Sequence, residues 1–403
     1  SMVGKSAISF PRNTFVVSGL MPPRWAICIS LRFMLQCYEE CAIVSYFSGM
    51  PGNSIGDSLK LTTYGESHGD QIGGILDGMP AGISIDIDAI QKELDRRRPG
   101  QSHLTTERAE HDQVRIHSGV FEGKSTGTPI AFSILNKDQR SKDYSALEQV
   151  YRPSHADYVY DAKYGHRDHR GGGRSSARET ACRVVGGALA ALVIPEIQVR
   201  AWTSSVGPVE IKTDWQHLDL TQIDAHPTRC PDPEAAAEME AYIEHVREEK
   251  DSTGGTVTVV ATGVPAGLGE PVFDKLQADL AKAMLSINAV KGFEIGSGMA
   301  AAEMRGSQHN DEITQGFETK TNNAGGVVGG LSNGAPIQLR IAFKPVATIG
   351  KAQETVNSAG ERVVLEAKGR HDPCVVPRAV PIVEAMVRLV LADHYLRNLK
   401  YTR

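Results

Sequence analysis

The run GHRDHRGGGRSSARETACR, residues 165–183, constrains the fold more than any other part of this 403-residue chain. It places arginines and histidines around three consecutive glycines and then passes directly into the apolar segment ARETACRVVGGALAALVI. Glycines let a backbone approach a ligand closely, and guanidinium groups bind phosphate and carboxylate. The run therefore indicates either an RGG/RS-type nucleic-acid segment or a loop that holds a small phosphate-bearing molecule.

The helix predicted after the glycines separates these two alternatives. Ser176-Ala177-Arg178-Glu179 has the spacing of a capping box, so we expect the apolar helix to begin there and to be ended by Pro195. Unpaired N–H groups at its start, flanked by Arg174 and Arg178, would bind an anion. An RGG tract would be repetitive and disordered. The run occurs once, and a net charge of −5 does not suit a surface that binds nucleic acid or anionic membrane. We expect a small-molecule site, with no nucleic-acid partner and no membrane partner.

Residues 1–49 differ from the rest of the chain. They hold three of the six cysteines and no acidic residue before Glu39, and their apolar stretch WAICISLRFML is too short to span a bilayer. Met50 then opens MPGNSIGDSLKL, which reads like a natural start. We expect residues 1–49 to be an N-terminal extension outside the catalytic fold, with an organellar targeting segment as the alternative. The cysteines show no metal-ligand spacing, which is typical of a reducing, cytoplasmic setting.

From Met50 onward, short apolar strands alternate with glycine turns and a few helices. DAIQKELDRRR predicts a helix over 88–98 with Ile90 and Leu94 on one face. No Gly/Ser-rich or Pro-rich linker divides residues 50–403, so we expect one α+β catalytic domain with residues 211–250 as an acidic, helical surface insertion. Further helices are predicted at 273–285 and 381–399, and strands at 255–264 and 335–345.

One motif occurs twice. GMPAGISIDIDAIQKEL (78–94) and GVPAGLGEPVFDKLQADL (263–280) share a Gly-x-Pro-Ala-Gly turn that leads into a predicted helix. Either a common turn is used twice, or the domain consists of two related, pseudo-symmetric halves. The pattern leaves both interpretations open.

Four shorter motifs carry residues suited to acid–base chemistry or anion binding. TTYGESHG (62–69) holds His68 in a tight loop, either as a hydrogen-bonded turn residue or as an acid near a phosphate. YRPSHADYVY places Arg152 and His155 three positions apart. DRRRPGQSH carries three adjacent arginines, of which some suit a helix C-terminus and at least one remains to reach a ligand. GRHDPC brings Arg370, His371 and Asp372 onto one turn.

Taken in order, GESHG, RRRPG, RPSHAD, RGGGRSSARET, SINAVKG and GRHDPC closely resemble the chorismate synthase family, from Met50 to near the C-terminus. The resemblance implies a lyase of the shikimate pathway that converts 5-enolpyruvylshikimate 3-phosphate to chorismate and phosphate with reduced FMN and no net redox change. It also implies a β-α-β sandwich with helices between antiparallel sheets, internal pseudo-symmetry and a homotetramer. Whether the flavin is reduced by NADPH on this chain or by an external flavin reductase stays open.

The resemblance further implies roles for individual residues. His68 would protonate the departing phosphate, His155 would assist protonation of the reduced flavin, and Ser67 with Asp372 would relay a proton. The residues expected at the substrate are Arg97, His103, Arg152, Arg178 and Arg370. The residues expected at FMN are Arg174, Ser175, Ser176, Asn288, Ala289, Gly329, Lys344, Pro345, Val346, Ala347, Thr348 and Arg370. The chain departs from the family pattern at His103, His166, His169, Val346 and Ala347.

Overall fold

The computed structural model describes residues 52–105, 112–136, 148–366 and 372–401. Its contacts divide the chain into Ser1–Gly52 and Asn53–Arg403. Only Gly52 of the first unit is described, so the helices and strands below all belong to the second unit. In the described ranges, no helix has the length and apolar character needed to cross a membrane. Arg370, which was predicted at the site, and its neighbour His371 lie outside the described residues.

The first sheet has five antiparallel strands in the order β1-β2-β3-β7-β4. In β3, Ile72 and Leu76 are fully buried while Ile75 is exposed, because successive side chains of a strand point to opposite faces. One face of this sheet therefore contributes to the core. The strands are β1 (Ser54–Ile55), β2 (Lys60–Gly65), β3 (Gln71–Asp77), β4 (Val114–Ile116) and β7 (Ile130–Leu135).

The second sheet also has five antiparallel strands, in the order β11-β14-β10-β8-β9. Its β10 and β14 confirm the strands predicted at 255–264 and 335–345. Helix α5 (Pro233–Glu248) packs on β8 and β9 through Ala236, Met239 and Ile243, which are fully buried. The segment predicted as a surface insertion therefore covers this sheet with an apolar face. The strands are β8 (Gln198–Val206), β9 (Val209–Glu210), β10 (Gly255–Thr262), β11 (Val290–Ile295) and β14 (Ile337–Phe343).

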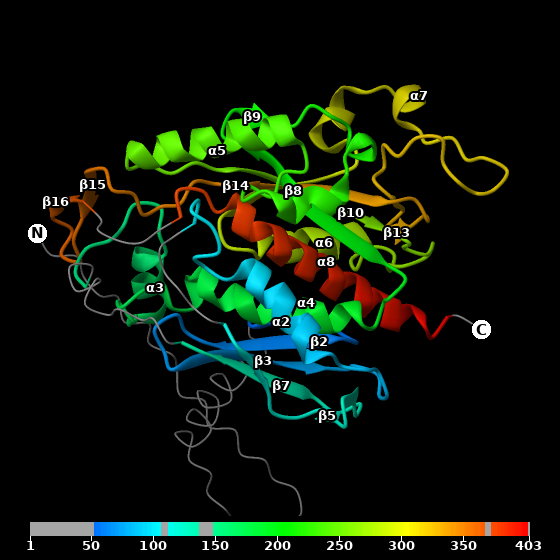
Figure 1. Cartoon of the computed structure of the whole chain (residues 1–403), viewed down its shortest axis with the longest axis horizontal. Helices are drawn as coiled ribbons and strands as arrows, with labels where there is room; N and C mark the ends of the chain where they lie inside the picture. The colour runs from blue at the N-terminus through cyan, green and yellow to red at the C-terminus, as the bar shows by residue number, and fades with distance from the viewer. Residues whose placement is uncertain (1–51, 106–111, 137–147, 367–371, 402–403) are drawn as a thin grey trace, which may run out of the picture. The chain divides into compact units, whose positions relative to one another are not determined.

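A layer of helices lies between the two sheets (Figure 1). Helix α4 contacts β2 and β3 of the first sheet, while α8 contacts β8 and β10 of the second, and the two helices pack on each other. A Cβ added at Gly187 of α4 would lie 2.4 Å from Cα of Ala385 in α8, so only glycine permits this close crossing. The expected α+β sandwich is confirmed. The helices are α2 (Ile87–Arg97), α4 (Thr180–Ala191), α6 (Leu276–Leu285) and α8 (Val376–Asn398).

The predicted helix boundaries agree to within one residue at both ends of α2 and at the C-terminal ends of α6 and α8, and differ by three or more residues at the starts of α6 and α8. Helix α8 begins at Val376, five residues before the predicted start, because Pro377 occupies its first turn, where no N–H bond is needed. Helix α4 ends at Ala191 and not at Pro195. The smaller elements are β5 (Val120–Phe121), β6 (Lys124–Ser125), α3 (Asp157–Tyr164), α7 (Gly306–His309), β12 (Val327–Val328), β13 (Leu331–Ser332), β15 (Gln353–Val356) and β16 (Arg362–Leu365).

The two copies of the repeated motif adopt the same turn. Ser125 Oγ donates to the carbonyl of Pro80 at 2.6 Å, and Ser332 Oγ donates to the carbonyl of Pro265, also at 2.6 Å. In each copy, the N–H of the last glycine donates to the carbonyl of that serine at 2.8 Å. Both motifs follow the central strand of a sheet and lead to a helix of the middle layer, α2 or α6. The repeated sequence motif therefore corresponds to a repeated local structure.

Candidate functional site

A fully buried carboxylate, Asp112, lies between two buried arginines. Its Oδ2 accepts a hydrogen bond of 3.0 Å from Nη1 of Arg97, and its Oδ1 accepts one from Nη1 of Arg178. Arg97 also donates to Thr180 Oγ1 at 3.1 Å and to the carbonyl of Ala177 at 2.7 Å. The three charged side chains carry two positive charges and one negative charge, so the cluster favours an anionic ligand.

The pKa of Arg97 is lowered mainly by its burial and further by neighbouring cations. Burial lowers the pKa of Arg97 to about 10; Asp112 opposes the shift, while Arg378 and Arg178 reinforce it. Arg378 in turn donates to the carboxylate of Asp372, which belongs to the described part of the GRHDPC motif. A bound anion would favour the charged form of Arg97, since opposite charges nearby stabilise a buried cation.

Asn136 joins this cluster to the GESHG loop. Its Oδ1 accepts from Nε of Arg178 at 2.8 Å, and its Nδ2 donates to the carbonyls of Glu66 at 3.0 Å and Gly69 at 2.7 Å. The amide therefore fixes both ends of the loop that carries His68. We infer that the position of this loop depends on the arginine cluster.

Inside the loop, Ser67 and His68 are buried, and Ser67 Oγ lies 3.0 Å from His68 Nδ1. Gly171, the first glycine of the GGG run, packs directly on this pair. A Cβ at Gly171 would lie 2.3 Å from His68 Nδ1 and 2.9 Å from Ser67 Oγ. The glycine is thus required to admit the GESHG loop, and the structure brings these two motifs into contact.

Helical structure begins after Ser176, as predicted, but its first turn is 3₁₀ and not α. Two 3₁₀ turns, Gly173–Ser175 and Ala177–Glu179, precede α4, which begins at Thr180. Their N–H groups are bonded locally: Ser175 donates to Gly172 O at 2.8 Å, and Arg178 donates to Ser176 Oγ at 3.3 Å. Such turns satisfy the groups that an α-helix would leave unpaired.

Arg174, predicted to flank that helix start, binds the end of β2 instead. It donates to the carbonyl of Gly65 at 3.0 Å and to Thr63 Oγ1 at 2.7 Å. These acceptors are neutral, and no carboxylate in the described part of the chain forms an ion pair with Arg174. Its guanidinium therefore adds unneutralised positive charge beside the GESHG loop.

The RPSHAD turn is organised around Asp157 at the start of α3. Its carboxylate accepts from Nε and Nη2 of Arg152, both at 2.8 Å, and lies 2.8 Å from Nδ1 of His155. Burial would raise the pKa of Asp157, but hydrogen bonds from Arg152 and His155 outweigh burial and lower the pKa below its usual value. The ionised carboxylate holds a proton on His155 Nδ1, so Nε2 of the neutral ring carries the lone pair.

Several residues predicted at the cofactor meet beside this turn. Asn288 Nδ2 donates to the carbonyl of Ser175 at 2.7 Å, and Ala289, with φ of 68°, accepts from the N–H of Lys344 at 2.9 Å. Lys344 Nζ donates to the carbonyl of Ser154 at 3.1 Å. Burial lowers the pKa of Lys344, and the neighbouring Lys291 lowers it further. The arrangement is rich in donors and positive charge.

Other predicted residues lie at the edge of this group or apart from it. Val346 accepts at its carbonyl from Ser252 Oγ at 2.8 Å, and Thr348 is buried. Gly329 turns the β12–β13 hairpin, whose Gly330 accepts from the N–H that opens α6. Asn288 follows the other end of that ten-residue helix, which is about 15 Å long. His103 contacts α5 through Glu240.

Three residues of the site were missed by the sequence analysis. Asp112 and Asn136 belong to no recognisable motif, and their partners are distant in the sequence. Asp157 lies within the RPSHAD motif, two residues after the histidine and five after the arginine. This spacing was the available signal that the aspartate binds both side chains. Buried cations require a carboxylate partner, which is the general reason to search for such residues.

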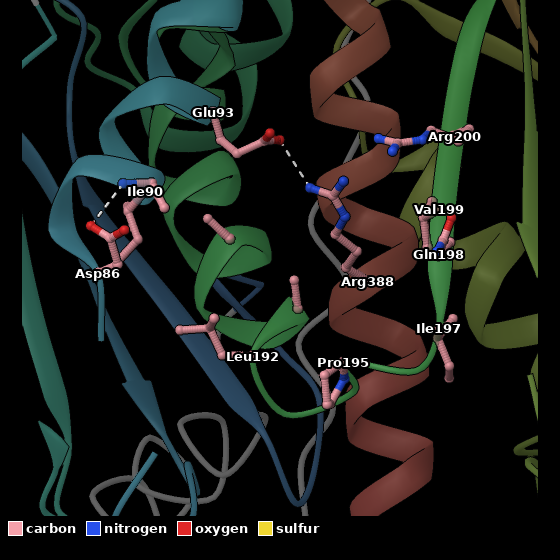
Figure 2. Close-up of a pocket in the computed structure, with 13 residues that line it drawn as sticks. Asp86, Ile90, Glu93, Leu192, Pro195, Ile197, Gln198, Val199, Arg200 and Arg388 are labelled. Carbon is pink, nitrogen blue, oxygen red and sulfur yellow. Dashed lines mark hydrogen bonds and ion pairs between the residues drawn. The ribbon is translucent and has the colours of Figure 1, made fainter. Parts of the chain in front are cut away.

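A separate hollow of about 400 Å³ lies between α2, α4, α8 and β8 (Figure 2). Glu93 and Arg388 form an ion pair of 2.9 Å across it, and Arg200 lies on its far wall. Arg388 is also paired with Glu384 at 3.6 Å, so its charge is balanced within the protein. None of the residues predicted for catalysis or binding lines this hollow.

Comparisons with known proteins agree with the motifs. The family model described as "Chorismate synthase" matches residues 59–396. Curated chorismate synthases of Christiangramia forsetii and Flavobacterium psychrophilum are 60% and 57% identical, each alignment covering 87% of this chain and 99% of the relative. A structure titled "Crystal Structure of Chorismate Synthase" superposes with a TM-score of 0.69 at 34% identity, covering 86% of this chain and 94% of the other.

Proposed function

Since the chain belongs to the chorismate synthase family, we propose that its buried arginine cluster binds 5-enolpyruvylshikimate 3-phosphate. The chain is a lyase, and elimination of phosphate from this substrate gives chorismate. The observation that carries the assignment of the site is the surplus positive charge of Arg97, Asp112 and Arg178. A substrate with one phosphate and two carboxylates requires such a surplus.

The two arginines retain donors for this substrate. A guanidinium has five N–H donors. Each of the three guanidinium nitrogens of Arg97 donates one hydrogen bond, to Asp112, Thr180 or Ala177. Two of its five N–H donors therefore remain. Arg178 likewise makes one bond from each of its three nitrogens. We assign Arg152 and Arg370 to the same substrate, and Asp112 to holding the first two cations in place.

His68 and His155 are the proposed proton-handling groups. With Nδ1 of His68 facing Ser67 Oγ, we assign Nε2 to protonation of the departing phosphate oxygen. His155 Nδ1 is held by Asp157, and we assign its Nε2 to proton transfer beside the cofactor. Ser67 and Asp372 are proposed to relay the proton that leaves the substrate ring.

The residues near Lys344 fit FMN. Asn288 Oδ1 is buried and, among the described residues, has no hydrogen-bond partner, so it can accept from a flavin ring N–H. The ammonium of Lys344 suits the flavin phosphate. When bound, reduced FMN supplies electron density as the C–O bond breaks and takes up the ring hydrogen. We assign its binding to Arg174, Ser175, Ser176, Asn288, Ala289, Gly329, Lys344, Pro345, Val346, Ala347, Thr348 and Arg370.

Anaerobic turnover tests this function. We expect the full chain to form chorismate and phosphate in equal amounts when supplied with chemically reduced FMN, and to form none with oxidised FMN alone. Adding NADPH to oxidised FMN then distinguishes two cases. Activity would show that this chain reduces its own FMN with NADPH, and inactivity would show that it needs an external flavin reductase. Failure to form chorismate with reduced FMN would contradict the proposal.

The N-terminal extension is proposed to be dispensable. Residues 1–49 contain none of the motif residues, so a chain that begins at Met50 is expected to keep the turnover of the full chain. Turnover and thermal unfolding should be measured on both chains. A shortened chain that folds normally and lacks activity would show that these residues contribute to the site.

We also propose that the domain is internally pseudo-symmetric. Four neighbouring strands of the first sheet, β2-β3-β7-β4, correspond in sheet order and in chain order to β8-β10-β14-β11 of the second, whereas β1 precedes β2 and β9 follows β8. The shared Ser125 and Ser332 turns support the same pairing of halves. We further propose a cytoplasmic homotetramer with no nucleic-acid or membrane partner, which is compatible with the net charge of −5.

A further inference from the structure

A second group of potential ligand atoms combines two residues of helix α5 with His103, a residue that the resemblance placed at the substrate. His103 Nε2 is 2.5 Å from Glu240 Oε1 and 3.7 Å from Glu244 Oε1. Each of these three side chains offers one ligand atom, and all three atoms lie within 4.8 Å of one another. Glu240 and Glu244 are four residues apart and therefore share a face of α5. His103 reaches them from the loop that follows α2.

A second histidine orients the central carboxylate. His226 Nε2 lies 3.1 Å from Glu240 Oε2, the oxygen that does not face His103. The Nδ1 of His226 accepts from the backbone N–H of Thr228 at 3.3 Å, so in the neutral ring the proton is on Nε2 and is donated to Glu240. In metal sites, hydrogen bonds of this kind from residues outside the coordination sphere orient the ligating side chains. Glu240 is therefore held with Oε1 directed at His103.

We propose that His103, Glu240 and Glu244 bind one Zn²⁺ ion, with water as the remaining ligand. One imidazole and two carboxylates form a nitrogen–oxygen donor set that zinc accepts, and the two carboxylates neutralise its charge. Tetrahedral bonds near 2.0–2.2 Å place ligand atoms about 3.3 Å apart. The 2.5 Å and 3.7 Å separations lie on either side of that value, so small side-chain rotations suffice.

The ion would replace the proton shared by His103 and Glu240, because metal ligands must be deprotonated. His103 and Glu244 are half exposed, at 54% and 50%, so the ion can enter from solvent without opening of the fold. The bound ion would then connect α5 to the loop that follows Arg97. Arg247 already holds this loop, by donating to the carbonyl of His103 at 2.6 Å. The site does not depend on the reaction proposed above.

The same helix supplies a matched control. His245 and Glu249 are also four residues apart, 3.4 Å from each other and exposed, but Lys351 lies 3.6 Å from Glu249 and competes with a cation. No third potential ligand is grouped with this pair in the described part of the chain. His245→Ala therefore removes a histidine of similar exposure from α5 without touching the proposed site.

Isothermal titration of the chelator-treated full chain with Zn²⁺ tests the site. We expect one ion per chain, with affinity lowered more than about 100-fold in His103→Ala and about 10–100-fold in His226→Phe, and unchanged in His245→Ala. Glu244→Gln should behave like His103→Ala. Equal zinc affinity in the original chain and in both ligand variants would overturn the proposal, as would failure of the original chain to bind.

Two further measurements separate this site from the cysteines of residues 1–49. Zn²⁺ should raise the melting temperature of the original chain and of His245→Ala, but not that of His103→Ala, because a ligand that binds only the folded state stabilises it. Co²⁺ bound at an imidazole–carboxylate site lacks the thiolate charge-transfer absorption of a cysteine site. An intense thiolate band from the bound Co²⁺ ion would also overturn the proposal.

Discussion

Replacing Asp112 with alanine is expected to lower the free energy of unfolding by about 3–5 kcal/mol, the range for removing one partner of a buried ion pair. The substitution leaves the guanidinium groups of Arg97 and Arg178 buried, close together and without a carboxylate. Denaturant unfolding measures the loss. The specificity constant kcat/KM should also fall, since neither arginine is then held in position.

Asp224→Ala is the matched control for this experiment. Asp224 also joins two arginines, at 2.9 Å from Arg96 Nε and 3.0 Å from Arg229 Nε, but its side chain is 50% exposed. Water screens such a pair, so we expect a loss of roughly 1 kcal/mol. Asp112→Asn keeps the shape and removes the charge, and should resemble Asp112→Ala. Equal losses for the two aspartates would show that burial of the carboxylate is not the cause.

Elements with a strong local pattern were predictable from the sequence. The helix at α2 follows from Ile90 and Leu94, which are spaced four residues apart and are both buried. Strand β10 follows from β-branched residues, and its burial on both faces explains why the pattern alternates only partly. The repeated turn was visible because its glycines, with positive φ at both ends, tolerate few substitutions.

The start of α4 was not predictable, for a local reason. Ser-x-x-Glu spacing at 176–179 suggests a capping box, but Glu179 forms an ion pair with Arg183 at 2.8 Å. Only the serine half of the motif forms, with Ser176 Oγ accepting from Arg178. A 3₁₀ turn and a capped α-helix satisfy the same N–H groups, so residue types alone do not separate them.

The cations of the site were predictable, but their anions were not. Arginines in glycine-rich motifs stand out because a chain with net negative charge has little other reason to concentrate them in a loop. Asp112 is 15 residues from Arg97 and 66 from Arg178, and this pairing exists only in the folded chain. Long-range pairs leave no periodic signal in one sequence, and so the buried partner of a predicted cation must come from the structure.

Replacing His68 or His155 with alanine is expected to lower turnover by roughly 10- to 1000-fold, the effect of losing a general acid or base. Each histidine has one ring nitrogen held by a neighbour, Ser67 at 3.0 Å or Asp157 at 2.8 Å, and the proposal assigns proton transfer to the other nitrogen. Both variants should stay soluble and bind oxidised FMN. The two losses need not add, because the steps they assist need not both limit the rate.

The alternative is that each histidine only fixes its turn. In that case, His68→Ala or His155→Ala would lower the melting temperature and leave the activity per folded molecule intact. Asp157→Asn sharpens the test for His155, because the amide no longer provides the charge that stabilises protonated imidazole, and the pH dependence of turnover should change. His245→Ala, which removes an exposed side chain of α5, controls for the loss of a histidine as such. Measuring activity and melting temperature on the same preparations decides each case, and unchanged activity in a folded variant would remove that histidine from the mechanism.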